Sequence, residues 1–233
     1  MAKSQQGDEQ PQNQRPTILY IARHTDVHNP ADILYGRLPR YRLSDLGHQQ
    51  ADATASVLAE EPVSAIYSSP RLRARQTAAI LAARHPGLNV RITKLLDEVQ
   101  TAWQGRPHSE LEEIRFNFYG NPLHESDETL DEIWERIQKF VRQARARHKG
   151  ETVVAVSHGD PVIIARAGYL GLPITIESLR LPYVYPGKGS ITRLTFCHDE
   201  DTYPQSVEYY DPNSDDPAWS QGWVRLGASG HAE

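Results

Sequence analysis

The sequence of 233 residues contains a single cysteine, Cys197, and no long apolar run. One cysteine excludes an intramolecular disulfide and any zinc cluster built from cysteine thiolates. No apolar stretch approaches the roughly 20 residues that a transmembrane helix needs, so we expect no membrane span. The first fifteen residues lack the apolar core of a secretory signal. These absences predict a cytoplasmic protein, kept in a reducing environment.

A strong excess of charge of one sign is absent too. The net charge is -5, from 25 Lys and Arg against 30 Asp and Glu. This balance argues against a general nucleic-acid-binding protein or a protein of anionic membrane surfaces. Arginine is nevertheless unevenly spread and forms two clusters of three. We interpret most of these six residues as parts of solvated faces, and the alternative is a local pocket for a small anion. The clusters are Arg37, Arg40 and Arg42, and then Arg71, Arg73 and Arg75.

Length and composition favour one α/β domain between two less regular ends. Residues 1–15 are rich in Gln, Asn and Glu, which predicts a disordered tail. Residues 16–200 contain the regular apolar patterns of a folded domain. Residues 201–233 are rich in Asp, Pro, Ser and Gly, so we expect an extension that is only partly docked, through Trp219 and Trp223.

Short apolar runs alternate with helical patterns along residues 17–170, which predicts βαβ units and a mostly parallel sheet. The clearest amphipathic helix runs from Leu130 to Ala144, with either Thr129 or Ser126 as its N-cap. Glycine and proline at 171–173 end the last helix of this series. The predicted strands are 17–22, 63–67, 89–93, 152–156, 191–196 and 207–210. The other predicted helices are 45–60, 70–84 and 161–170.

Polar groups follow the three most convincing strands of this pattern. Arg23-His24 follows the first, Ser68-Ser69 with Arg73 the second, and Ser157-His158-Gly159 the third. In open α/β sheets the ligand crevice lies beyond the carboxyl ends of the strands, so these groups are expected to converge. They predict an anion site with two histidines and at least two arginines.

Each residue type suits the chemistry of a phosphate ester. A neutral imidazole such as that of His24 attacks phosphorus and splits one displacement into two easier ones. Arg23 and Arg73 match phosphate geometry and neutralise its charge without a metal, and His158 donates to the same oxygens. The leaving oxygen needs a proton, for which Glu98 is the best-placed carboxyl.

The ordered set of motifs resembles the histidine phosphatase superfamily, which includes cofactor-dependent phosphoglycerate mutases. Arg23-His24-Thr25 resembles the family's Arg-His-Gly signature, and Ser157-His158-Gly159 its second histidine block. The run 68–78 is similar to the phosphate-binding block, which selects Arg73 over its neighbours, and 43–51 resembles the entry to the first helix. The resemblance implies a three-layer α/β/α sandwich with a mostly parallel central sheet (phosphoglycerate mutase-like), and a catalytic domain over 16–200.

Three positions depart from the family's pattern. Thr25 replaces the glycine after the nucleophile, so we expect its side chain to narrow or reshape the pocket. Asn29 lies one residue early for the family's asparagine and is taken as a further phosphate ligand. The acidic block is one residue shorter than usual, so Asp97 is kept in reserve as the proton donor in place of Glu98.

The sequence thus predicts a metal-independent phosphomonoester hydrolase that acts through a phosphohistidine on His24. We expect it to be a histidine phosphatase of the acid or broad type. A mutase that returns the phosphoryl group to another hydroxyl, and a silent phosphoester-binding module, are the alternatives. We expect no cofactor and no metal, since the arginines repel a cation and no His-Glu-x-x-His is present. The expected partner is a small phosphorylated metabolite. The sequence leaves open whether the protein forms a homodimer. The other eight histidines are expected to be surface or hydrogen-bonding residues.

Overall fold

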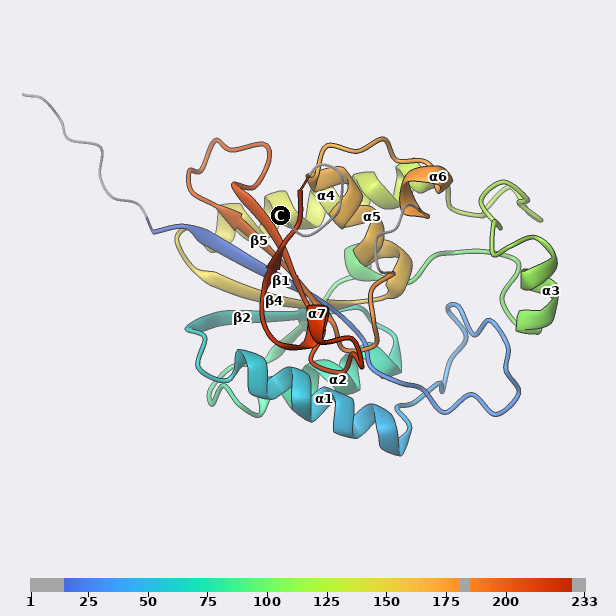
Figure 1. Cartoon of the computed structure of the whole chain (residues 1–233), viewed down its shortest axis with the longest axis horizontal. Coiled ribbons are helices and arrows are strands. Elements are labelled where there is room, and N and C mark those ends of the chain that lie inside the picture. The colour runs from blue at the N-terminus through green and yellow to red at the C-terminus, as the bar shows by residue number, and fades with distance from the viewer. Residues whose placement is uncertain (1–14, 181–184, 228–233) are drawn as a thin grey trace, which may run out of the picture.

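A seven-stranded sheet forms the centre of the computed structural model, which describes residues 15–180 and 185–227 (Figure 1). The predicted tail, residues 1–15, falls outside this range except for Arg15. The spatial order is β3-β2-β4-β1-β5-β6-β7. The strands are β1 (Thr17–Arg23), β2 (Val63–Ser68), β3 (Val90–Ile92), β4 (Thr152–Ser157), β5 (Ile191–Phe196), β6 (Ser206–Tyr210) and β7 (Val224–Arg225).

The sheet is parallel where the predicted βαβ units lie. Strands β3, β2, β4 and β1 pair in parallel, whereas β5, β6 and β7 are added antiparallel, one after another. The helices along the chain are α1 (Asp45–Leu58), α2 (Leu72–Ala82), α3 (His108–Glu113), α4 (Leu130–Arg147), α5 (Gly159–Tyr169), α6 (Ile176–Leu179) and α7 (Pro217–Ser220). The expected fold class, with a mostly parallel central sheet, is confirmed.

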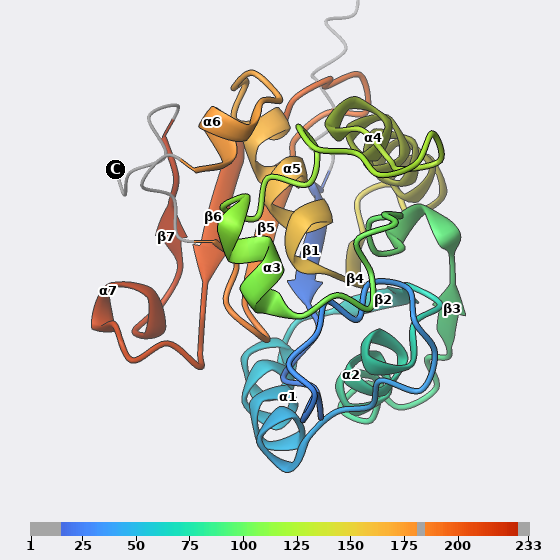
Figure 2. The same ribbon diagram turned by 90° about the vertical axis from the view of Figure 1, so that its right-hand side faces the viewer.

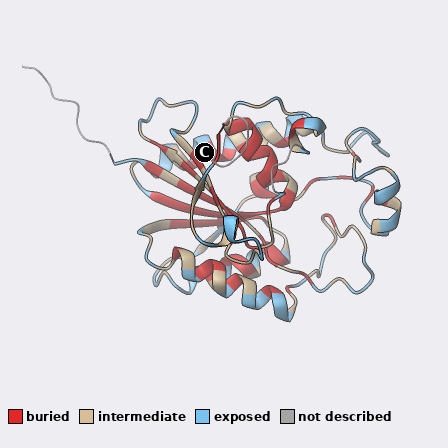
Figure 3. Cartoon of the chain, viewed as in Figure 1, coloured by how far each residue is buried: buried red, intermediate tan, exposed pale blue. Residues whose placement is uncertain are grey.

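Two apolar cores cover the two faces of the sheet (Figures 1 and 3). Successive strand residues point to opposite faces, so Leu19 packs in the core under α4 and α5, while Tyr20 packs in the core over α1 and α2. Helix α4 begins at the capping box that Thr129 forms with Glu132, which decides between the two predicted N-caps. The result is the expected three-layer sandwich.

The carboxyl ends of the parallel strands meet at one edge of the sheet. The loop after β1 and the segment that carries α3 lie over this edge (Figure 2). Gly47, at the start of α1, allows a close approach of two backbone segments here, because a Cβ at this position would lie 2.1 Å from the Asp26 carbonyl oxygen. The glycine of the helix-entry motif therefore lets α1 support the loop that carries His24.

Several short elements were not predicted. They are the 3-10 turn η1 (Lys94–Leu96), α3, α6, α7 and β7. Each is six residues or shorter, too short to show a hydrophobic period. Trp219 packs on Tyr209 and Trp223 on Tyr20, so the described part of the 201–233 extension contacts the sheet. In the described ranges no helix has the length and apolar character needed to cross a bilayer.

Candidate active site

His24 lies directly after β1 and is 1% exposed. Its Nδ1 lies 2.8 Å from the Thr25 carbonyl oxygen, which can only accept a hydrogen bond. The proton is therefore on Nδ1, and the Nε2 lone pair is free to accept from Arg73 Nε at 3.1 Å. Burial, followed by the charge of Arg73, lowers the pKa of His24 well below its ordinary value. The imidazole is thus neutral, in the tautomer that attacks through Nε2.

Arg73 is the buried cation at the centre of the site. It lies in the first turn of α2 and is fully buried. In addition to its bond to His24, its Nη2 donates to the Gly36 carbonyl oxygen at 2.9 Å, contacts His158 Nδ1 at 3.1 Å and donates to Glu98 at 3.2 Å. One guanidinium thus touches the predicted nucleophile, the second histidine and the predicted acid.

His158 comes directly after β4 and is also fully buried. Its Nε2 lies 2.7 Å from Ser69 Oγ, and the Ser69 hydroxyl donates to Asp97. Nε2 therefore donates to Ser69, which leaves Nδ1 facing Arg73 and Glu98. Burial lowers the pKa of His158 to about 4, even though the nearby Glu98 carboxylate opposes that shift. The two predicted histidines lie side by side, with ring centroids 5.1 Å apart.

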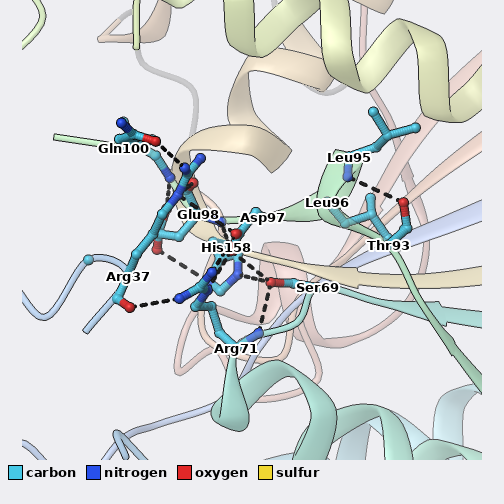
Figure 4. Close-up of polar contacts among 12 residues, drawn as sticks. Arg37, Ser69, Arg71, Thr93, Leu95, Leu96, Asp97, Glu98, Gln100 and His158 are labelled. Atoms are coloured by element: carbon cyan, nitrogen blue, oxygen red, sulfur yellow. Dashed lines mark hydrogen bonds and ion pairs between the residues drawn. The ribbon is translucent and has the colours of Figure 1, made fainter. Parts of the chain in front are cut away.

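The two candidate acids have different surroundings (Figure 4). Arg71 binds Asp97 with both ends of its guanidinium, at 2.7 Å each, so Asp97 fixes the start of α2. Glu98 instead lines the cavity and contacts Arg73 and His158. Burial alone would raise the pKa of Glu98, but its contacts with His158 and with the Arg73 guanidinium outweigh burial and hold that pKa far below its ordinary value. The geometry supports Glu98 over Asp97.

The two remaining predicted phosphate ligands, Arg23 and Asn29, differ in whether they have a polar group available to bind phosphate. Arg23 lines the cavity, donates through Nη1 to the Pro186 carbonyl oxygen at 2.5 Å, and has a buried Nε without a hydrogen-bond partner. That nitrogen is available to an oxyanion. Asn29 also lines the cavity, but both ends of its amide are bonded to the Ile33 backbone. The phosphate-binding role of Asn29 therefore stays a prediction.

Thr25 does not narrow the pocket, which is contrary to the expectation from the sequence. Its side chain is fully buried and lies 3.3 Å from the Thr77 hydroxyl, on the side of α2. The cavity lining includes His24 and Asp26 but not Thr25. The Thr25 side chain is therefore directed into the protein and not toward the cavity.

The arrangement of His24, Glu98 and His158 resembles a metal site by composition, since their donor atoms lie within 4.8 Å of one another. The Arg73 guanidinium, however, contacts all three groups. It takes the position that a cation bound by them would need, and two positive charges there would repel each other. The residues present do not fit a metal ion.

A cavity of about 620 Å³ opens from Arg23, His24 and Glu98. In the 99–127 segment, Tyr119 and His108 line the cavity, whereas Arg106 and Arg115 do not. Sequence reasoning missed Tyr35, Phe116 and Asp160 in its wall. Asp160 could have been found, because it directly follows the Ser-His-Gly motif, whereas Phe116 carries no such signal. Of the clustered arginines, Arg37 and Arg71 brace neighbouring loops and only Arg73 enters the site.

The two buried neutral histidines predict acid-sensitive stability. The unfolded chain takes up protons near pH 6.5, whereas folded His158 does so only near pH 4, so the free energy of unfolding falls as pH drops from 6.5 to 4. His158 alone contributes roughly 3 kcal/mol over this window, and its contribution is constant above pH 6.5. Urea unfolding measured at pH 4 to 8 tests this.

The pH slope should shrink in His158→Gln and stay unchanged in His48→Gln, which alters an exposed histidine on α1. An unchanged slope in the His158 variant would contradict the assignment of a buried neutral imidazole.

Comparison with known proteins agrees with this geometry. The sequence profile of the Histidine phosphatase superfamily (branch 1) matches residues 19–207. The chain belongs to this superfamily. It is 38% identical over 157 residues to an uncharacterized protein of Mycobacterium tuberculosis, which covers 63% of this chain and 75% of the relative. It is 28% identical over 165 residues to phosphoserine phosphatase 1 of Hydrogenobacter thermophilus, with 67% and 78% covered.

Among solved structures, this histidine phosphatase superfamily member is similar to a mycobacterial glucosyl-3-phosphoglycerate phosphatase. The TM-score is 0.66 at 28% identity, covering 78% of this chain and 91% of the other. The profile match includes every predicted site residue. The superfamily and its neighbours thus agree with a phosphatase or a mutase activity.

Proposed function

We propose that the protein hydrolyses phosphomonoesters without a metal, through a phosphohistidine on His24. The observation that carries the proposal is the state of that side chain. His24 is neutral, has its proton fixed on Nδ1 by the Thr25 carbonyl, and turns Nε2 toward the guanidinium of Arg73. A nucleophile and a phosphate-binding cation are therefore already in contact.

The first step transfers the phosphoryl group to the enzyme. Arg23 Nε and the Arg73 guanidinium bind the phosphoryl oxygens, and His158 donates to them after it takes up a proton at Nδ1, which the substrate's charge favours. The His24 Nε2 lone pair forms the N–P bond as the bond from phosphorus to the ester oxygen breaks. Charge stabilisation by these donors is the main catalytic effect.

Glu98 supplies and then recovers a proton. Without substrate its carboxylate contacts two groups of the phosphoryl site, Arg73 and His158. A bound phosphoryl group takes the Arg73 donors and places negative charge beside the carboxyl, which raises its pKa and favours the protonated form. Glu98 then protonates the leaving oxygen. In the second step it accepts a proton from the water that attacks phosphorus, and His24 leaves as a neutral imidazole.

Phosphate release from an aryl phosphate and a panel of phosphometabolites, measured in chelator, tests the proposal. The panel includes 3-phosphoglycerate and phosphoserine. Release that persists in chelator supports a metal-independent phosphatase. Isomerisation of 3-phosphoglycerate without release would instead identify the alternative mutase, and phosphate binding with neither reaction would identify a silent phosphoester-binding module.

Glu98→Gln is predicted to impair hydrolysis in proportion to how much the leaving group needs a proton. We expect kcat to fall by about 10²- to 10³-fold for alkyl phosphates, and much less for aryl phosphates with acidic phenols. Steady-state rates for a series of esters with graded leaving-group pKa measure this.

Asp97→Asn is the matched variant for this test. Because Asp97 is bound by Arg71, the substitution is expected to lower thermal stability while leaving the dependence of the rate on the leaving group unchanged. If the Asp97 variant, and not the Glu98 variant, became more sensitive to the leaving group, the assignment of the acid would be reversed.

The remaining expectations about the protein's setting are part of this proposal. A small phosphorylated metabolite fits a cavity of about 620 Å³. The net charge of -5 supports the absence of nucleic-acid and anionic-membrane partners. A cytoplasmic location stays a prediction of the sequence, which leaves open whether the protein is a homodimer.

A further inference from the structure

The cavity is far larger than a phosphoryl group requires. Arg23, His24 and Glu98 form one end of it, and its volume of about 620 Å³ is in the range that binds whole drug-sized ligands. The space beyond those three residues must therefore receive the alcohol part of the ester. The chemistry of its wall indicates which alcohol fits.

Apolar side chains from separate parts of the chain form much of that wall. Val99 and Phe118 come from the segment after η1, Ile163 from α5, and Ile176 and Leu179 from α6. Val99, Phe118 and Ile163 are buried in the main core, so they are held in place without a ligand. A preformed apolar wall favours an apolar ligand surface.

Phe116 adds an exposed aromatic ring to this wall. It is 46% exposed, although large apolar side chains gain from burial. Its φ is +54° and that of Arg115 is +52°, a left-handed conformation that residues with a side chain rarely adopt. The turn is held by hydrogen bonds from Phe116 N–H to the Leu111 carbonyl oxygen at 2.7 Å and from Arg115 N–H to that of Glu112 at 2.9 Å. Backbone strain of this kind is typical of ligand-binding walls.

The charged groups of the outer cavity disfavour an anionic substituent. Outside the phosphoryl site, the described lining carries three carboxyls, Asp26, Asp32 and Asp160, against two cations, Lys188 and Arg180. Lys188 binds Asp26, His108 lies 2.7 Å from Asp32, and Arg180 donates to the Arg115 carbonyl oxygen.

A half-buried carboxyl, that of Asp160, makes this region still less suitable for an anion. Asp160 accepts hydrogen bonds from the hydroxyls of Tyr119 and Tyr185, at 2.6 Å each, and has no ion-pair partner among the described residues. A substrate carboxylate in the outer cavity would face this acidic group in a wall that holds more carboxyls than cations.

We propose that the preferred substrate is a phosphomonoester of an uncharged, largely apolar alcohol, an inference that rests on the proposed phosphatase function. The apolar wall receives the body of the alcohol, and Phe116 covers it at the mouth. Carboxylated esters such as phosphoserine and 3-phosphoglycerate are poor substrates by this account.

Three alkyl phosphates with closely similar leaving groups test this: ethyl phosphate, hexyl phosphate and 6-phosphooxyhexanoate. The first pair differs in apolar length, and the second pair differs in a terminal carboxylate. We expect kcat/KM for hexyl phosphate to exceed that for each of the other two by roughly tenfold or more. Equal values, or a preference for the carboxylated ester, would overturn the inference while leaving the phosphatase function intact.

Phe116→Asn tests the wall itself. Asparagine tolerates a positive φ better than phenylalanine, so the turn should still fold, but the ring is lost. The preference for hexyl over ethyl phosphate should fall several-fold, mainly through a higher KM for the hexyl ester. Leu123→Asn is the matched control, because Leu123 is also 46% exposed but does not line the cavity. An unchanged preference in the Phe116 variant would contradict its role.

Binding of non-hydrolysable phosphonates separates this inference from the proposed function. Hexylphosphonate is expected to bind more tightly than 6-phosphonohexanoate in calorimetry. If neither ester is hydrolysed but this order holds, the phosphatase function fails and the ligand class stands. If the order is reversed, the ligand class is wrong whether or not hydrolysis occurs.

Discussion

His24→Ala is expected to abolish phosphate release while the protein stays folded. The imidazole supplies the electron pair of the proposed N–P bond, and no other described histidine combines a free Nε2 with contact to Arg73. Loss of a covalent nucleophile lowers kcat by on the order of 10⁴-fold or more. Steady-state phosphate release from an aryl phosphate measures the loss, and circular dichroism checks the fold.

The matched control for this variant is His48→Ala, which removes an exposed histidine from the surface of α1. Its activity should equal that of the wild type. Activity of the His24 variant within tenfold of the wild type would exclude His24 as the nucleophile.

Arg73→Lys is expected to have the second-largest effect. The guanidinium uses Nε toward His24 and Nη2 toward His158, Glu98 and the Gly36 carbonyl. A lysine ammonium keeps the charge but cannot place donors at both positions. We expect kcat/KM to fall by about 10²- to 10³-fold, the effect of losing a donor to transition-state charge.

Arg75→Lys, two residues along the same helix, is the control for charge-conserving substitution. Arg75 is exposed, so this change should leave kcat/KM unaltered. If Arg73→Lys retained full activity, or if both variants lost it equally, the guanidinium geometry would not be the reason for catalysis.

The strands and the site at their ends were predictable because their signals are local. Continuous apolar runs such as 152–156 predict buried parallel strands, and the polar residues that follow them converge by topology. His24, Arg73 and His158 were placed this way, and in the structure the Arg73 guanidinium contacts both histidines and Glu98. The capping box at Thr129 was equally visible, since it depends on residues three positions apart.

The substrate-facing wall was not predictable, because its contacts join distant and irregular segments. Phe116 lies in a turn with positive φ after a six-residue helix, and no periodicity marks it. The Asp160 contacts with Tyr119 and Tyr185 span 41 and 25 positions of the chain. Thr25 was misjudged for a related reason, because a residue type does not tell whether its side chain faces the ligand or α2.

The most direct test of the account is to trap the phosphoryl-enzyme. A phosphomonoester labelled on phosphorus is mixed with excess enzyme, quenched in alkali within one turnover, and the labelled protein is mapped by mass spectrometry. The account predicts one acid-labile, alkali-stable phosphoryl group on the peptide that carries His24, absent from the His24→Ala variant. Label on another residue, or single-turnover phosphate release with no labelled protein at any time, would contradict a phosphohistidine on His24.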